Sequence, residues 1–204
     1  RNSLILKMIP HKYFISTSFN FILSKPNIKI KKNKKISSTI LEAINIILNK
    51  NYSIEEFNLN NLNKRLFIES ERLLPDCDYV GFSITQGNIY RKKQWPMDKV
   101  IKTCEELIKY NKKPVFFIEK KYKEIKNIIK SGVPSALFPE HETSLNSPAL
   151  VTCLGKRLDF AITIDNGVMH MLSLSKVPLI SLFGPTDAEK FAPKYKNSLV
   201  LDSK

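Results

Sequence analysis

The chain has 204 residues, of which 43% are apolar and 25% are charged, a composition typical of a folded globular protein. Without an apolar run near the 18 or so residues that cross a bilayer, or an apolar stretch ending at a cleavage site, the sequence predicts neither a membrane span nor a secretory signal. The first residue is Arg1 rather than Met, so we expect a fragment or a processed product.

The net charge of +14 arises from 33 basic and 19 acidic residues. Taken alone, such a charge favours a polyanionic partner, either nucleic acid, an anionic membrane surface or a phosphorylated ligand. Only five of the basic residues are arginines, the side chain that nucleic-acid readers use most for base contacts. The sequence also holds 24 isoleucines and 17 asparagines, a bias expected of an AT-rich genome. We therefore predict no nucleic-acid partner.

The cysteines, Cys77, Cys104 and Cys153, are odd in number and far apart. No Cys-x-x-Cys pair is present, so the sequence predicts neither a zinc site nor a thioredoxin-like site, and a reduced, cytosolic setting fits best. Cys104 and Cys153 lie among apolar residues at helical spacing, which predicts that both are small buried side chains.

The first part of the chain, before Leu74-Pro75, lacks a regular rhythm of strands and helices. It contains a basic run at residues 29–35, which is either a solvated face or a surface for an anionic ligand or membrane. A helix is predicted after Ser37 or Ser38, which can cap it, because apolar residues from Ile40 to Leu48 recur at helical spacing. Asn-rich polar sequence at 58–63 leads to the boundary.

From Asp78 onward, apolar strands alternate with amphipathic helices. This alternation predicts an α/β, Rossmann-like parallel sheet with helices on both faces, in which ligands bind at the carboxyl ends of the strands. Strands are expected at 79–84, 114–118, 135–138, 160–164, 178–183 and 199–201. Helices are expected at 100–108, 122–132, 147–155 and 168–175. Neither a G-x-G-x-x-G fingerprint nor a P-loop is present.

The loop Asp165-Asn166-Gly167-Val168-Met169-His170 joins a predicted buried strand to a helix. Gly167 allows a tight turn, and the amides and dipole of the new helix favour an anion. Asp165 can accept hydrogen bonds from ligand hydroxyls, with His170 in reach of the same crevice. The alternative is structural: Asp165 caps the helix and His170 is a core histidine.

Two further strand ends carry polar residues. The segment Gly184-Pro185-Thr186 is a rigid turn with an exposed hydroxyl, a weak signal when taken alone. The loop from Ser83 to Asn88 precedes a basic cluster and Trp95, and such a loop either cradles a phosphate with one lysine as cation or is simply solvated.

Together these motifs resemble glycosyltransferase family nine, which contains the lipopolysaccharide heptosyltransferases. The family pattern reads K-x-W-P, then D-[ST]-G-x-x-H, then L-F-G-P-T-[DS]; here it stands as Lys93-Gln94-Trp95-Pro96, Asp165 to His170, and Leu182 to Asp187. The resemblance is strong over 78–204 and faint over 1–77. It implies the GT-B fold, with residues 78–204 as the donor-binding domain and residues 1–77 as the end of an acceptor domain and the interdomain connection.

The resemblance also implies a function: transfer of a sugar, possibly a heptose, from a nucleoside-diphosphate sugar such as ADP-heptose to a lipopolysaccharide-type or other glycan acceptor. Transfer would invert the anomeric centre and need neither a metal nor a cofactor, in the cytoplasm or at the inner face of its membrane. At the positions that match the family motifs, the resemblance implies that Lys93 contacts the diphosphate and that Asp165 contacts the sugar hydroxyls. The other implied binding residues are Ser83, Thr85, Gln86, Glu119, Phe138, Asn166, Gly167 and His170.

The sequence departs from the family pattern in three respects. Asn166 replaces the usual Ser or Thr, and Ile118-Glu119-Lys120-Lys121 replaces a glycine-rich turn. The family's general base is an aspartate near the start of the acceptor domain, which this sequence does not include, so we expect these residues alone not to catalyse transfer. The alternatives are a non-catalytic module that binds a nucleoside diphosphate, and a basic protein that binds nucleic acid or a membrane surface.

Overall fold

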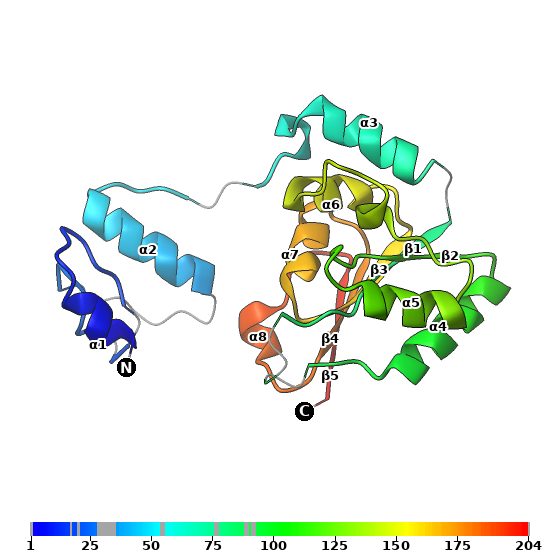
Figure 1. The fold of residues 1–204 in the computed structure, drawn as a ribbon. Helices are drawn as coiled ribbons and strands as arrows, with labels where there is room; N and C mark the ends of the chain where they lie inside the picture. Colours follow the sequence, from blue (N-terminus) through cyan, green and yellow to red (C-terminus); the bar gives the residue numbers. More distant parts are fainter. Residues whose placement is uncertain are drawn as a thin grey trace. The chain divides into compact units, whose positions relative to one another are not determined.

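The computed structural model describes residues 2–16, 18–19, 21–27, 36–53, 56–75, 78–87, 90 and 93–203. The chain forms two compact units: residues 1–56 with 189–191, and residues 57–188 with 192–204. Figure 1 shows the elements of each unit. No helix among the described residues is long and apolar enough to cross a membrane.

The smaller unit contains α1 (Asn2–Lys7) and α2 (Ile36–Leu48). The expected helix is therefore present, but it begins at Ile36, so Ser37 and Ser38 lie within it and the expectation that one of them caps it is wrong. The basic run at 29–35 lies outside the described residues. The described part of this unit buries only Phe21 and Ala43 as apolar side chains. Many large apolar residues remain exposed, including Leu4, Ile5, Leu6, Met8, Phe19, Ile22, Ile40, Ile44, Ile46 and Leu48. The described part of the smaller unit therefore exposes many apolar side chains of α1 and α2 and has no sizeable core.

The larger unit is built on a five-stranded parallel sheet, which confirms the predicted fold class. Its strand order is β2-β1-β3-β4-β5. The strands are β1 (Tyr79–Ser83), β2 (Lys113–Phe116), β3 (Phe160–Ile164), β4 (Leu179–Phe183) and β5 (Ser198–Asp202). The strand expected at 135–138 is wrong: this segment makes one parallel bridge, Val115 with Leu137, before Pro139 begins the short 3-10 helix η3 (Pro139–His141).

Helices cover both faces of the sheet, as the alternation predicts. They are α4 (Met97–Lys109), α5 (Lys123–Gly132), α6 (Pro148–Gly155) and α7 (Gly167–Leu174). The short α8 (Ala188–Phe191) follows β4 in the chain, and its residues 189–191 belong to the smaller unit. Val80, Phe82 and Ile84 of the β1 segment pack with α4 and α5 in one buried cluster. Right-handed crossovers then place α6 and α7 on the opposite face, where the two helices contact each other (Figure 1).

The segment before the sheet packs with the sheet unit, so the two compact units divide near residue 56 rather than at 77. The short 3-10 helix η1 (Leu59–Asn61) precedes α3 (Lys64–Leu73), which contacts α6. Arg157 fixes the end of this segment by donating to the carbonyls of Leu74, at 2.9 Å, and Pro75, at 2.8 Å. Assignment of residues 1–77 to an acceptor domain remains a prediction.

The predicted burial of Cys104 and Cys153 is confirmed, since both side chains are fully enclosed. Burial raises the pKa of Cys104 to about 12, which keeps it a neutral thiol. Cys77 lies outside the described residues.

Candidate functional site

The candidate site lies where β1, β3 and β4 end. Because the three strands are parallel neighbours, their following loops emerge at one edge of the sheet. Register sets this alignment: Ser83 pairs with Thr163, and Ile164 pairs with Leu182. The loops after residues 83, 164 and 183 therefore meet, and they carry most of the residues that the sequence indicates.

Asn166 joins α7 to the end of β1. Its side-chain oxygen accepts from the backbone N–H of Met169 at 3.0 Å and so caps the helix. Its amide nitrogen donates to Ser83 Oγ at 2.8 Å and to the Thr85 carbonyl at 3.0 Å. Both amide hydrogens and the oxygen are thereby engaged within the protein. Asn166 therefore positions the loop, and it is Asn166 rather than Asp165 that caps α7.

Ser83 is fully buried and accepts the bond from Asn166. The family resemblance implies that Ser83 contacts the ligand, whereas the structure buries its hydroxyl as a support of Asn166. Thr85 is half-buried and contributes its backbone carbonyl to the same support. Gln86 Oε1 accepts from the backbone N–H of Lys93 at 2.9 Å and so fixes the chain on which that lysine stands.

Lys93 and Asp165 form a nearly enclosed ion pair, with side chains only 9% and 10% exposed. The Lys93 ammonium contacts Asp165 Oδ2 and lies 3.2 Å from the Asp165 carbonyl. Thr186 Oγ1 donates to the same Oδ2 at 2.7 Å. Thr186 belongs to the Gly-Pro-Thr turn and was absent from the expected site residues, although its place at a strand end was a signal for it.

Gly167 and His170 stand on the first turn of α7. Gly167 has a negative φ, so the turn does not depend on the conformational freedom that the sequence suggested. A Cβ added at Gly167 would meet only the tip of Met171, at 3.9 Å, which leaves open space in front of the helix. Desolvation and the Lys93 charge lower the pKa of His170 against the opposing effect of Asp165, and this favours a neutral imidazole.

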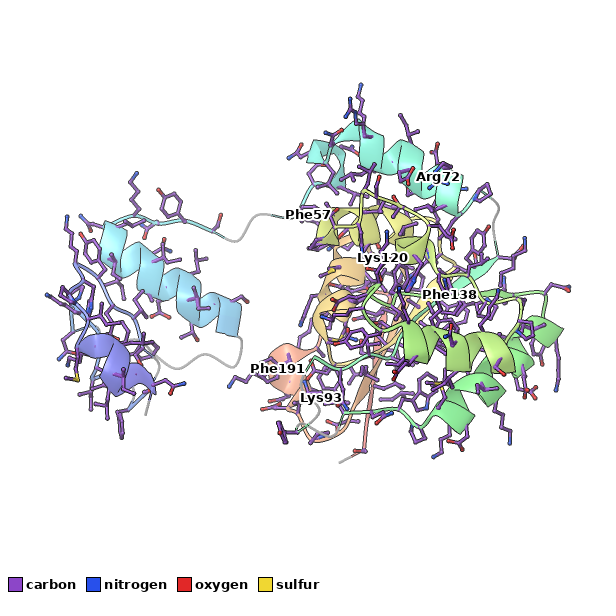
Figure 2. All side chains as sticks on the ribbon, in the orientation of Figure 1. Phe57, Arg72, Lys93, Lys120, Phe138 and Phe191 are labelled. Atoms are coloured by element: carbon purple, nitrogen blue, oxygen red, sulfur yellow. The ribbon has the colours of Figure 1, made fainter. Side chains whose placement is uncertain are left out.

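Two of the residues that the resemblance implies for ligand binding, Glu119 and Phe138, lie away from the cluster around Asp165. Glu119 is exposed and pairs with Lys121 at 2.6 Å. Phe138 is buried, and its ring stacks on Phe116 with centroids 5.7 Å apart. Figure 2 shows Lys93 and Phe138 on separate parts of the sheet unit. The structure therefore does not bring these two residues together with the cluster around Asp165.

The turn after Phe138 holds two polar residues that sequence reasoning missed, Glu140 and His141. Glu140 is only 5% exposed, and its Oε2 has no hydrogen-bond partner among the described residues; the same is true of His141 Nε2. Burial, together with the charge of Glu119, raises the pKa of Glu140. A buried acidic side chain in a turn gives no periodic signal, which explains why the sequence did not reveal it.

Glu140→Gln is expected to stabilise the chain at pH 8. A carboxyl whose pKa is raised on folding favours the folded state below the unfolded pKa, and this contribution is lost as pH rises through the folded pKa. The amide is neutral at every pH, so we expect a gain of roughly 1 kcal/mol at pH 8 and almost none at pH 4. Thermal unfolding at both values measures it. Glu124→Gln on the exposed surface of α5 is the control. An equal effect of Glu140→Gln at pH 4 and pH 8 would contradict a raised pKa of Glu140.

These features define a class: a Rossmann-like α/β domain whose strand ends carry a helix N-terminus, a buried lysine and a buried carboxylate. The family model of glycosyltransferase family 9 (heptosyltransferase) matches residues 9–203. The chain therefore belongs to glycosyltransferase family 9, and the match extends well before residue 78, where the sequence motifs begin. A comparison with curated proteins gives no significant match.

Solved structures share the fold. A family 9 glycosyltransferase from Veillonella parvula is 19% identical with a TM-score of 0.66, and the match covers 90% of this chain and 54% of that one. Escherichia coli heptosyltransferase WaaC with ADP is 16% identical with a TM-score of 0.65, covering 90% and 55%. Escherichia coli ADP-heptose heptosyltransferase II is 20% identical with a TM-score of 0.58, covering 69% and 44%. The chain thus spans about half the length of these proteins.

Proposed function

We propose that the sheet unit binds the nucleoside-diphosphate sugar of a glycosyltransferase reaction. The observation that carries this proposal is the meeting of Lys93, Asp165 and the N-terminus of α7 at the ends of β1, β3 and β4. Family membership supports glycosyl transfer, and two neighbouring structures were solved with ADP or an ADP-heptose analogue. ADP-heptose is therefore the donor that we favour.

The diphosphate is expected at the N-terminus of α7. A helix start presents unpaired backbone N–H groups and the positive end of the dipole, and Gly167 leaves the space before them open. In this structure the Lys93 ammonium is neutralised by Asp165. A bound diphosphate carries more negative charge than the Asp165 carboxylate, so Lys93 turns toward the diphosphate. The lysine then has an anionic partner both before and after the donor binds.

Asp165 then becomes available for the sugar. A carboxylate released by its lysine accepts hydrogen bonds from the hydroxyls of a bound sugar, the group that lies next to the diphosphate. Asn166, Ser83, Thr85 and Gln86 support these two residues from behind, as their hydrogen bonds indicate. The His170 imidazole stands on the same helical turn and is neutral, which avoids a second cation beside Lys93.

The chemistry that this site supplies is stabilisation of the leaving group. When the glycosidic bond to the donor breaks, negative charge accumulates on the nucleoside diphosphate, and the ammonium of Lys93 with the amides of α7 stabilises it without a metal ion. Attack by an acceptor hydroxyl from the opposite face would invert the anomeric centre. The group that removes the hydroxyl proton is not assigned to any residue of this chain.

We further propose a glycan or glycolipid acceptor of lipopolysaccharide type, reached at the cytoplasmic face of a membrane. The support is the smaller unit, where exposed Leu4, Ile5 and Met8 lie beside Lys7. Apolar side chains next to lysines are the combination that binds the surface of an anionic bilayer. Co-sedimentation with anionic and neutral vesicles tests this contact, and equal binding to both would contradict the role of charge.

Calorimetric titration of the chain with ADP, UDP and ADP-heptose tests the donor proposal. We expect ADP-heptose to bind and Asp165→Ala to remove the contribution of the sugar, so that the variant binds ADP-heptose no better than ADP. Circular dichroism establishes that the variant is folded. A folded wild-type chain that binds none of the three ligands would overturn the proposal.

A further inference from the structure

We propose that Thr186 is the positioning residue of Asp165: its hydroxyl holds one carboxylate oxygen so that the other faces the sugar of the bound donor. This inference rests on the proposed function and adds a residue to it, since Thr186 lies on a different strand loop from both Lys93 and Asp165.

The fold delivers Thr186 to this place through strand register. Ile164 pairs with Leu182, so Asp165 and Phe183 leave the sheet side by side. The chain then bends at residues 184–186, and Pro185 restricts its own backbone φ. The result places the Thr186 hydroxyl 2.7 Å from Asp165 Oδ2. Because adjacent β3 and β4 set this geometry, the hydroxyl position is fixed by the sheet rather than by a long loop.

The two oxygens of Asp165 are used unequally. Both side-chain bonds, from Lys93 and from Thr186, end on Oδ2, and within the described part of the chain none ends on Oδ1. A carboxylate held by one oxygen presents the other in a fixed direction. Oδ1 is therefore the atom available to a ligand hydroxyl, and its direction depends on what holds Oδ2.

Thr186 matters most once the donor is bound. In this structure Oδ2 has two partners, so Lys93 still holds the carboxylate when the Thr186 bond is lost. When Lys93 turns to the diphosphate, the Thr186 hydroxyl becomes the remaining side-chain bond on Oδ2. Removing this hydroxyl therefore loosens the Asp165 carboxylate when the donor is bound and has little effect on it when no donor is bound. A purely structural threonine would show the opposite pattern.

The test compares Thr186→Val, which keeps the shape and loses the hydroxyl, with Thr186→Ser, which keeps the hydroxyl. Calorimetry with ADP-heptose and ADP is expected to show about tenfold weaker binding of ADP-heptose by Thr186→Val, less than about threefold weaker binding of ADP, and recovery in Thr186→Ser. Thr103→Val on α4, whose exposed hydroxyl donates to the Lys99 carbonyl at 2.8 Å, is the matched control. Thermal unfolding accompanies each titration.

Two results would overturn the inference while leaving the donor proposal intact. One is binding of ADP-heptose by Thr186→Val at the wild-type level. The other is an equal loss for ADP and ADP-heptose together with a lowered melting temperature, which would make Thr186 a structural residue. Absence of binding by the folded wild-type chain is a separate outcome, because it refutes the donor proposal and this inference with it.

Discussion

Lys93→Met is expected to destabilise the chain by about 3–5 kcal/mol and to abolish detectable ADP binding. The destabilisation follows from leaving the Asp165 carboxylate enclosed without its cation, since both side chains are nearly buried. The loss of binding follows from removing the ammonium proposed to meet the diphosphate. Urea unfolding measures the first effect, and calorimetric titration with ADP measures the second.

The double variant Lys93→Met, Asp165→Asn separates the two effects. It removes both charges, so most of the stability should return while ADP binding stays absent. Lys109→Met is the control for losing a lysine, because the Lys109–Glu106 pair is exposed and its loss should leave the unfolding midpoint unchanged. ADP binding by the double variant at the wild-type level would show that the diphosphate does not depend on Lys93.

Much of the sheet unit could be predicted because each element carries its own periodic signal. Five of the six predicted strands, including 160–164, are present. So is the helix that Ser147 caps by accepting from the Leu150 N–H. The strand at 135–138 failed because a short apolar run looks the same in a bridge as in a strand. Helix α3 went unpredicted since half of its ten residues are charged, and its packing on α6 depends on long-range contacts.

The candidate site was predictable only in part, for a related physical reason. Motifs indicated which loops matter, and the parallel sheet explains why the loops after 83, 164 and 183 meet. Partners within the cluster were not predictable, since the bonds of Asn166 to Ser83 and of Thr186 to Asp165 join residues far apart in sequence. Phe138 was assigned to a ligand through the family resemblance, but its ring contacts with Phe116 and His141 determine its position.

Asn166→Ala is expected to destabilise the sheet unit by about 2–4 kcal/mol. About 1 kcal/mol arises from the lost cap of α7, and the remainder from two lost bonds to the end of β1, one of which leaves the buried Ser83 hydroxyl without this donor. Urea unfolding is the measurement. Asn166→Thr restores the residue type usual in the family, but its one hydroxyl cannot make all three bonds, so we expect an intermediate loss.

Asn63→Ala isolates the part of this effect that belongs to the tie between α7 and β1. Asn63 caps α3 by accepting from the Arg65 N–H at 3.0 Å and is exposed, so its loss removes a cap and little else. The excess of Asn166→Ala over Asn63→Ala therefore measures what the two bonds to the Ser83 hydroxyl and Thr85 carbonyl contribute. Equal losses would mean that Asn166 serves only as a helix cap. A clear excess, with weaker ADP binding in Asn166→Ala alone, would show that the same amide that stabilises the sheet unit also holds the N-terminus of α7 in position for the diphosphate.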